Sequence, residues 1–359
     1  MAPRGYNNAY MGKRTGILHL LQRIVPLCAV LISSGCSTPK SSYTAIEGFA
    51  QGSTFRLVYE ENTTSMEYNI PDSLSLYFTQ IDKSLSGYDT TSIVSLINKG
   101  ENPPLDSLFI ECFNISKEVW RDTEGAFDIS AAPFFQMWGF GFGNKEKISQ
   151  EKIDSTMQIV GMDKLSIVYD STLEQSFLKK ADPRMQVNFN AIAQGYTCDY
   201  ICGKLEKMGI ANYLLEVGGE IMCKGVNAKG KEWGIAIDKP LDGNFIPGSS
   251  IEAIIEVSGK GLVTSGNYRK FYIEDGEKRS HTIDPRTGYP VKHNLLSATV
   301  IAPTAAMADA YATYLMVLGT EKAQEFLKSE AELDALLVYG EQDNLKVYAT
   351  PGVHQRKLK

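Results

Sequence analysis

The stretch "TAAMADAYATYLMVLG" (304–319) sets the strongest limit on how this chain can fold. It reads as a helix over 304–318, with Thr304 as a start signal and Gly319 as a stop signal. Apolar residues occupy almost every side of this helix, which predicts that it is buried between other elements. The chain has 359 residues, 43% hydrophobic and 22% charged, which is enough for a core of that kind.

One carboxylate interrupts this apolar helix. Asp309 lies in its middle, and Thr313 lies one turn later on the same face. A buried carboxylate is costly unless it is paired or binds a metal. A hard cation such as Mg²⁺ takes carboxylate, hydroxyl and carbonyl oxygens, so this pair could supply two ligands. The alternative is a carboxylate that is hydrogen-bonded to Thr313 or to a nearby arginine.

The remaining pattern predicts strands clustered between helices, without strict βαβ alternation. Helices are expected at 73–86, 105–121, 150–160 and 191–208, with strands at 43–61 around Gly52, 163–169, 173–178, 185–189, 213–217, 220–224, 233–237, 251–257, 269–274, 296–302, 334–339 and 344–348. This order favours an α+β fold with mixed or antiparallel sheets flanked by helices. We expect a single compact catalytic unit with a helical lobe at 70–160.

The N-terminus differs in kind from the rest. No acid precedes Glu47, and basic residues are followed by the short apolar run "IVPLCAVLI" (24–32) and then by "SSGCS". This order is typical of an export signal. We predict a lipoprotein-type signal peptide at 1–35, lipidation of Cys36, a tether at 36–44 and a catalytic domain at 45–350. The lipid would anchor the protein to a membrane without spanning it; the alternative is an ordinary signal peptide with a chance cysteine.

Charge limits the partners. The whole chain has a net charge of −6, and loss of the four basic leader residues leaves 32 lysines and arginines against 42 acids, or −10. An acidic surface argues against nucleic acid as a partner. It also repels a phosphorylated substrate, which would then need a local cation such as a bound metal. Outside the leader and Cys36, four cysteines lack zinc spacing and are expected to be buried free thiols: Cys112, Cys198, Cys202 and Cys223.

Two glycine-containing motifs are candidate ligand sites. "VNFNAIAQGYTCDY" (187–200) is a strand entering a helix, where free N–H groups suit phosphate and Gly195 permits close approach. Ordinary strand–helix packing is the alternative. "WGFGFGN" (138–144) alternates glycine with aromatics, which suits a planar ring stacked among Trp138, Phe140 and Tyr88. Its alternative is a loop pinned by core aromatics. Two further stretches, "LEVGGEI" (215–221) and "TSGNY" (264–268), are expected to be turns.

A histidine lies in the double turn "SHTIDPRTGYP" (280–290). His281, with an ordinary pKa near 6.5, can accept and return a proton at neutral pH. Asp284 could orient it or hold a nearby charge, while Pro285 and Gly288 fix the turn. A structural histidine in a tight loop is the alternative.

Taken together, the motifs resemble one family. "SLSGYDTTSIVSLIN", "GAFDISAAPFFQMWGFG", "NFNAIAQGYTCDYI", "LLEVGGEI", "TSGNYRKFY…SHTIDPRTGYPV" and "ADAYATYLMVLG" occur in the order found in the FAD:protein FMN transferases, the ApbE family. The resemblance covers roughly residues 45–348. It implies a Mg²⁺-dependent reaction in which FAD is cleaved, FMN is attached to a threonine or serine of an acceptor flavoprotein, and AMP leaves. Family acceptors include flavoprotein subunits, with FMN-binding domains, of exported electron-transfer complexes. Export with a lipoprotein-like cysteine is also common in the family, so the resemblance implies an exported bacterial lipoprotein facing the periplasm. The alternatives are a Mg²⁺-dependent FAD pyrophosphatase and a lipid-anchored FAD-binding protein.

The resemblance also implies roles for single residues. Asp309, Thr313 and the backbone carbonyl of Ala191 match the metal ligands, and His281 matches the proposed base, with Asp284 beside it. Residues that match FAD contacts are Gln51, Tyr88, Trp138, Gly139, Phe140, Asn188, Gln194 and Ile283. The chain departs from the family where Asp is usual at position 188 and Lys is frequent at 194, since both are neutral amides here. "QGS" at 51–53 likewise replaces Met-Gly-Thr.

Overall fold

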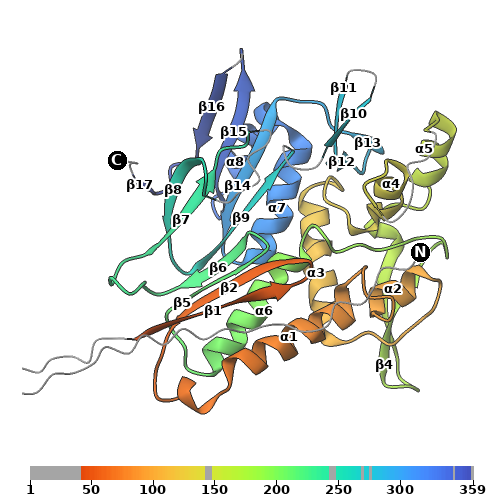
Figure 1. Ribbon diagram of the computed structural model, residues 1–359. Helices are drawn as coiled ribbons and strands as arrows, with labels where there is room; N and C mark the ends of the chain where they lie inside the picture. The colour runs from red at the N-terminus through yellow and green to blue at the C-terminus, as the bar shows by residue number, and fades with distance from the viewer. Residues whose placement is uncertain are drawn as a thin grey trace, which may run out of the picture.

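An eight-stranded antiparallel sheet forms the centre of the protein in the computed structural model (Figure 1). The structure describes residues 42–141, 148–241, 248–267, 271–274, 277–342 and 344–356. The predicted signal peptide, Cys36 and the tether up to residue 41 lie outside these ranges. The strand order is β1-β2-β5-β6-β9-β14-β15-β16. The strands are β1 (Tyr43–Ala50), β2 (Ser53–Glu60), β5 (Tyr213–Val217), β6 (Glu220–Lys224), β9 (Lys260–Gly266), β14 (Leu295–Ala302), β15 (Asp334–Glu341) and β16 (Asn344–Ala349).

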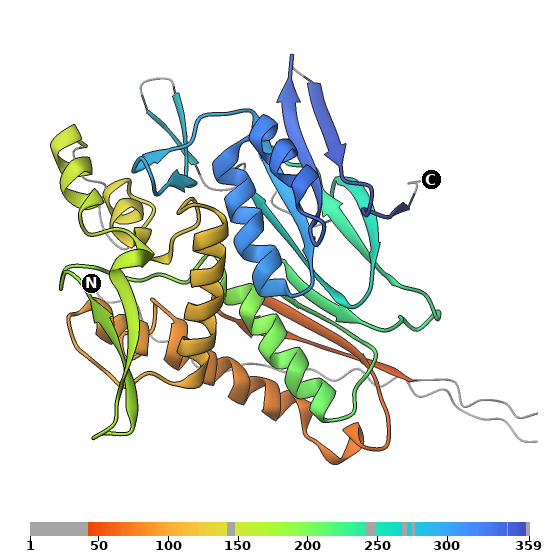
Figure 2. The same cartoon turned by 180° about the vertical axis from the view of Figure 1, so that it is seen from behind.

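Each face of this sheet is covered by a different layer. Helices α6 (Ala193–Lys207) and α7 (Ala305–Leu318) lie side by side against one face, seen from behind in Figure 2. The small sheet of β7 (Trp233–Asp238), β8 (Ile251–Val257) and β17 (Gln355–Arg356) shares a second core with the opposite face. Helix α8 (Thr320–Ser329) packs on β15. Burial on nearly all sides explains why α7 is apolar all round, as predicted.

A helical lobe lies beside α7. It contains α1 (Ile70–Leu85), α2 (Ile93–Asn98), α3 (Ser107–Asp122), α4 (Ala132–Met137) and α5 (Gln150–Met157), with the hairpin of β3 (Leu165–Asp170) and β4 (Gln175–Lys180). Short 3-10 turns lie at Ser65–Glu67, Ile129–Ala131 and Met162–Lys164. Polar side chains cap several of these helices, among them Asn69, Ser92, Asp106 and Ser149. The lobe confirms the helical region expected at 70–160, and the whole confirms an α+β fold.

One predicted strand, at 185–189, is wrong. Met185, Val187 and Phe189 are buried, but within the described residues the segment forms no strand and pairs with none. The side chain of Asn98 takes the place of a strand partner. Its amide donates to the Val187 carbonyl and accepts from the Val187 N–H, both at 2.8 Å. A side-chain amide can satisfy both backbone groups of Val187, so this buried segment does not require a sheet.

Other differences are local. The residues 264–266 expected in a turn belong to β9, and β10 (Phe271–Glu274) pairs with β11 (Glu277–Ser280). The turn at 215–221 is confirmed as the β5–β6 hairpin, with Gly218 and Gly219 at positive φ. The expected helix at 150–160 ends at Met157, and α2, α4 and α8 were not predicted. Predicted free thiols are confirmed: Cys112, Cys198, Cys202 and Cys223 are buried and unpaired. In the part of the chain that the structure describes, no helix has the length and apolarity needed to cross a bilayer.

Candidate active site

A cavity of about 430 Å³ opens between α7, the helical lobe and the loop before β12 (Ile283–Asp284). It gathers residues far apart in the sequence. The predicted site residues that line it are Tyr88, Phe140, Asn188, Ala191, Gln194, His281, Ile283, Asp309 and Thr313. A histidine in the loop before β12 and oxygen-bearing residues on α7 and before α6 therefore line one cavity.

Asp309 is a buried acidic residue at the cavity wall. Its side chain lines the cavity from α7, yet the residue is only 5% exposed. The backbone N–H of Gly195 on α6 donates to its Oδ2 at 3.2 Å. Burial raises the pKa of Asp309 to about 7; the Gly195 hydrogen bond opposes this and the nearby Asp199 carboxylate adds to it. A carboxylate placed this way is costly as an anion and gains from a cation at the cavity wall.

The neighbouring oxygens suit a hard cation. Thr313 lies one turn beyond Asp309, and Ala191 lies in the turn that leads into α6; both line the cavity with Asp309. Within the described residues no three His, Cys, Asp or Glu side chains gather as a metal cluster. The predicted set is of another kind, because it combines one carboxylate with a hydroxyl and a backbone carbonyl. Such all-oxygen donors fit Mg²⁺.

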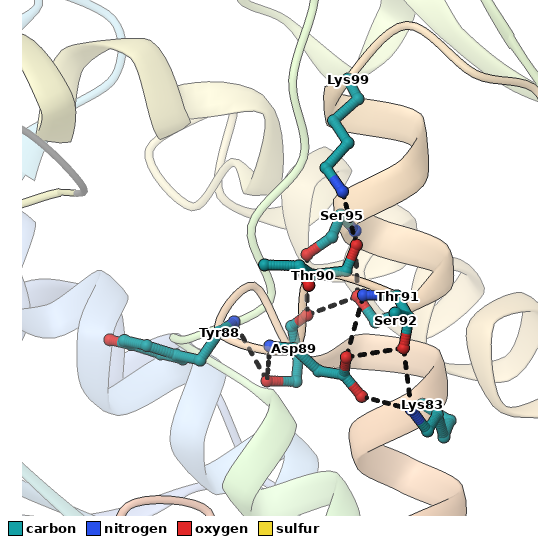
Figure 3. Close-up of polar contacts among 9 residues, drawn as sticks. Lys83, Tyr88, Asp89, Thr90, Thr91, Ser92, Ser95 and Lys99 are labelled. Carbon is teal, nitrogen blue, oxygen red and sulfur yellow. Dashed lines mark hydrogen bonds and ion pairs between the residues drawn. The ribbon is translucent and has the colours of Figure 1, made fainter. Parts of the chain in front are cut away.

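Tyr88 forms an aromatic wall of the cavity and is 72% exposed. Its loop joins α1 to α2 and is held by a dense set of polar contacts, from which the ring points away (Figure 3). Ser86 Oγ accepts from the N–H groups of Tyr88 and Asp89, at 3.1 and 3.3 Å. Lys83 pairs with Asp89 at 2.9 Å, and Lys99 donates to the Thr90 carbonyl at 2.6 Å. The loop thus presents a large exposed ring from a fixed backbone, which suits stacking on a planar ligand.

His281 lies between β11 and β12 and lines the cavity. Its ring lies edge-to-face with Phe140, with 6.3 Å between the ring centroids. The backbone around it is fixed, since Thr282 donates its hydroxyl to Asn267 at 2.6 Å and accepts at its carbonyl from Val291 N–H at 3.0 Å. A histidine held at a cavity wall in this way is placed to exchange a proton with a bound group.

Asp284 has a different position from the one expected beside His281. Its carboxylate forms a two-point ion pair with Arg286, at 2.9 Å for both Nε and Nη2, and accepts from the Arg286 N–H. Its own carbonyl accepts from Gly288 N–H at 2.8 Å. Asp284 does not line the cavity. Asp284 therefore holds the charge of Arg286 and closes the turn, as one of its two expected roles, and its carboxylate is engaged there rather than in orienting His281.

Three further predicted contacts lie away from the cavity wall. Trp138 is 4% exposed and donates its indole N–H to the Gly288 carbonyl at 2.8 Å, so it pins the loop rather than offering a face for stacking. Gly139, the next residue, has a positive φ and does not line the cavity. Gln51, in the β1–β2 turn, exchanges hydrogen bonds with Thr197 of α6 at 2.9 and 3.2 Å. The rest of "WGFGFGN", from residue 142, lies outside the described residues.

Sequence reasoning missed two half-buried carboxyl groups, Asp128 at the cavity wall and Asp199 near Asp309. Asp128 lines the cavity and accepts from Ser130 N–H, Ser130 Oγ and Met162 N–H, which ties two loops together. Asp199, on α6, accepts from the N–H groups of Ala305 and Ala306 at the start of α7, each at 2.8 Å. For Asp128 the sequence carried a signal like that of Asp309, an acid followed by the apolar run "ISAAPFF". Asp199 carried no such signal, because α6 mixes polar and apolar residues along its length.

The ionisation of Asp199 gives a test by pH. Burial raises its pKa to about 6, against the hydrogen bonds from Ala306, Ala305 and Thr304. The folded-state pKa exceeds the ordinary 3.8, so the folded protein binds this proton more tightly than the unfolded chain does. Protonated Asp199 therefore contributes fully to folding stability below pH 3.8, and this contribution is lost as pH rises through 6. We expect the unfolding free energy in EDTA to fall more steeply over this range in the wild type than in Asp199→Asn. The difference is at most about 3 kcal/mol, and urea unfolding at each pH measures it.

Asp89 supplies the control of opposite sign. Its ion pair with Lys83, with hydrogen bonds from Thr91, lowers its pKa to about 2. Its stabilisation is therefore present above pH 3.8 and is lost as pH falls toward 2. Asp89→Asn should alter the curve only below about pH 4. Equal slopes for the wild type and Asp199→Asn between pH 4 and 6 would contradict the assignment.

The fold and the cavity together define a mixed α+β protein with an enzyme-type pocket, in which a histidine, an exposed aromatic ring and an oxygen-donor set converge. A family model described as the ApbE family matches residues 52–337. The chain therefore belongs to the ApbE family.

Individual relatives agree with this membership. The FAD:protein FMN transferase of Escherichia coli strain K12 is 33% identical over 341 residues, covering 92% of this chain and 95% of that protein. The Haemophilus influenzae protein of the same name is 32% identical, with 89% and 92% covered. The solved apo form of Pseudomonas stutzeri flavinyl transferase ApbE matches with a TM-score of 0.76 at 32% identity, over 88% of this chain and 96% of that one. The flavin transferase ApbE from Vibrio cholerae matches with a TM-score of 0.74 at 28% identity, over 87% and 98%.

Proposed function

We propose that this protein transfers FMN from FAD to a threonine or serine hydroxyl of an acceptor flavoprotein and releases AMP. The carrying observation is the single cavity that Tyr88, His281 and Asp309 line together. It offers a ring-stacking wall, a proton acceptor and a carboxylate within one enclosure. The relatives that share most of the chain's length carry the name FAD:protein FMN transferase.

The residues divide the reaction among them. Tyr88 lies against the flavin ring, with Phe140 and Ile283 along the same cavity, and Asn188 and Gln194 hydrogen-bond FAD as neutral amides. The acceptor oxygen forms a bond to the FMN phosphorus, while the anhydride bond to the AMP phosphate breaks and AMP leaves with that electron pair. The hydroxyl proton passes to the imidazole of His281. Holding the reacting groups in line is most of what this chemistry requires.

Asp309, Thr313 and the Ala191 carbonyl are proposed to hold Mg²⁺. The support is the buried Asp309 carboxylate at the cavity wall and the all-oxygen character of the set. When bound, Mg²⁺ neutralises charge on the pyrophosphate oxygens. This also meets the need of an acidic protein, with a net charge of −6, for a local cation beside a phosphorylated substrate.

The test combines two products. The purified protein is mixed with FAD, Mg²⁺ and a candidate FMN-binding acceptor domain; flavin fluorescence is viewed on a denaturing gel and AMP is assayed. Fluorescence on the acceptor band with AMP release is the expected result. AMP and free FMN with a dark acceptor band, across several acceptor domains, would identify a pyrophosphatase instead. Bound FAD without either product would identify a binding protein.

We also propose that the protein is an exported lipoprotein facing the periplasm, anchored through Cys36. The support is the order of basic flank, apolar run and "SSGCS". Cys36→Ser removes the attachment atom, so the expected result is a shift of the protein from the membrane fraction to the soluble fraction of exported proteins. Fractionation followed by immunoblotting measures it, with Cys28→Ser in the leader as the matched control. Continued membrane association of Cys36→Ser would overturn the proposal.

A further inference from the structure

Helices α6 and α7 are joined by reciprocal hydrogen bonds at two levels. At one level, Asp199 of α6 accepts from Ala305 and Ala306 N–H of α7, each at 2.8 Å. At the other, Gly195 N–H of α6 donates to Asp309 Oδ2 of α7 at 3.2 Å. Gly195 and Asp199 are one turn apart on α6, and Ala305 and Asp309 are one turn apart on α7. The two levels therefore fix the register of one helix along the other.

Steric contact reinforces this register. A Cβ atom on Gly195 would collide with the carbonyl group of Ala305 and would lie 2.9 Å from the Asp309 Cβ. The two backbones are thus as close as a glycine allows, and α7 cannot slide along α6 without losing the hydrogen bonds. Thr304, the N-cap of α7, adds a hydrogen bond to Met307 N–H at 3.2 Å. Asp199 satisfies two of the remaining free N–H groups of that helix end.

We propose that Asp199 is a positioning residue for the cation site. Its carboxylate anchors the start of α7 and thereby sets where Asp309 and Thr313, one and two turns further on, meet the cavity. This role adds to the stability that any helix cap supplies, since a shift of α7 by a fraction of a turn moves both oxygen donors. The inference rests on the proposed Mg²⁺ site and assigns a residue that is not itself a ligand.

The test measures Mg²⁺ binding directly. The purified protein without FAD is titrated with Mg²⁺ by isothermal calorimetry, and the rise of its thermal midpoint with Mg²⁺ is recorded alongside. Asp199→Ala is expected to raise the Kd for Mg²⁺ by about 10- to 100-fold, the range found for residues that support metal ligands. FMN transfer by the variant should recover at raised Mg²⁺, which a purely structural defect would not do. Asp199→Asn keeps an acceptor oxygen; if the alanine variant does not fold, this variant should still raise the Kd several-fold.

Asp106 offers a matched control. It caps α3 by accepting from Phe109 N–H at 2.8 Å and from Ser84 Oγ at 2.7 Å, and it does not line the cavity. Asp106→Asn should lower the thermal midpoint but leave the Kd for Mg²⁺ unchanged. An unchanged Kd in folded Asp199→Asn, or an equal rise in Asp106→Asn, overturns the inference while the cation site stands. Absence of Mg²⁺ binding by the wild type, or equal binding by Asp309→Ala, overturns the cation site itself and the inference with it.

Discussion

His281→Ala is expected to lower the rate of FMN transfer by a factor on the order of 10²–10⁴, the range for loss of a general base. Among the described residues, His281 is the histidine that lines the cavity, and its loop is fixed by hydrogen bonds of Thr282 to Asn267 and Val291. The acceptor hydroxyl loses its proton as its oxygen bonds to phosphorus, so removal of the imidazole acts on that step. FAD and Mg²⁺ binding should change little, because the other cavity residues remain. Single-turnover transfer to a saturating acceptor measures the effect, and calorimetry measures binding.

His293 provides the control for this substitution. Its ring donates from Nε2 to the Met316 carbonyl at 2.7 Å and accepts from Leu295 N–H at Nδ1, 3.2 Å away, and it does not line the cavity. His293→Ala should lower stability and leave the transfer rate per folded molecule within a few-fold of the wild type. If His281→Ala transferred FMN as fast as His293→Ala, His281 would not be the proton acceptor.

The elements that the sequence predicted best are those that local pattern alone determines. The all-apolar helix at 304–318 is α7 almost residue for residue, and the Gly-Gly break at 218–219 is the β5–β6 turn. Where a single long-range side chain replaces the usual partner, pattern misleads. The segment 185–189 has the apolar composition of a strand, but its partner is Asn98, 89 residues away from Val187. Nothing in the sequence near Asn98 or near Val187 indicates that the two residues are hydrogen-bonded.

The candidate site divides in the same way. Asp309 could be singled out because an acid in an apolar helix is conspicuous, and His281 because it lies in a turn rich in Pro and Gly. The local sequence pattern does not show in which direction a loop side chain points. Trp138 and Phe140 are two residues apart in one aromatic loop, yet Phe140 lines the cavity and Trp138 is buried against Gly288. Asp284 pairs with Arg286, two residues later. In the sequence it also lies three residues from His281, which suggested a different partner. Asp199 acts through a helix more than 100 residues further along the chain.

Asp309→Ala is expected to have the largest effect on the reaction, a loss of transfer of about 10³-fold or more, since charge neutralisation by a metal contributes several kcal/mol. The variant should also lose its calorimetric response to Mg²⁺. The stability of the variant without Mg²⁺ should not fall, because Asp309 is 5% exposed and, among the described residues, its carboxylate accepts one hydrogen bond, from Gly195 N–H. Removal of a group that is costly to bury offsets the loss of its packing.

Asp309→Asn and Thr313→Val separate the parts of this expectation. The asparagine keeps the shape and removes the charge, so we expect nearly the full loss of transfer and of Mg²⁺ binding. The valine keeps the shape of Thr313 and removes one hydroxyl of the proposed set, so a smaller loss, about 10-fold in Mg²⁺ affinity, is expected. EDTA should reduce the wild type to the level of Asp309→Asn, and added Mg²⁺ should restore only the wild type. If the wild type in EDTA transferred FMN much faster than Asp309→Asn, the carboxylate would act in some way other than holding a cation.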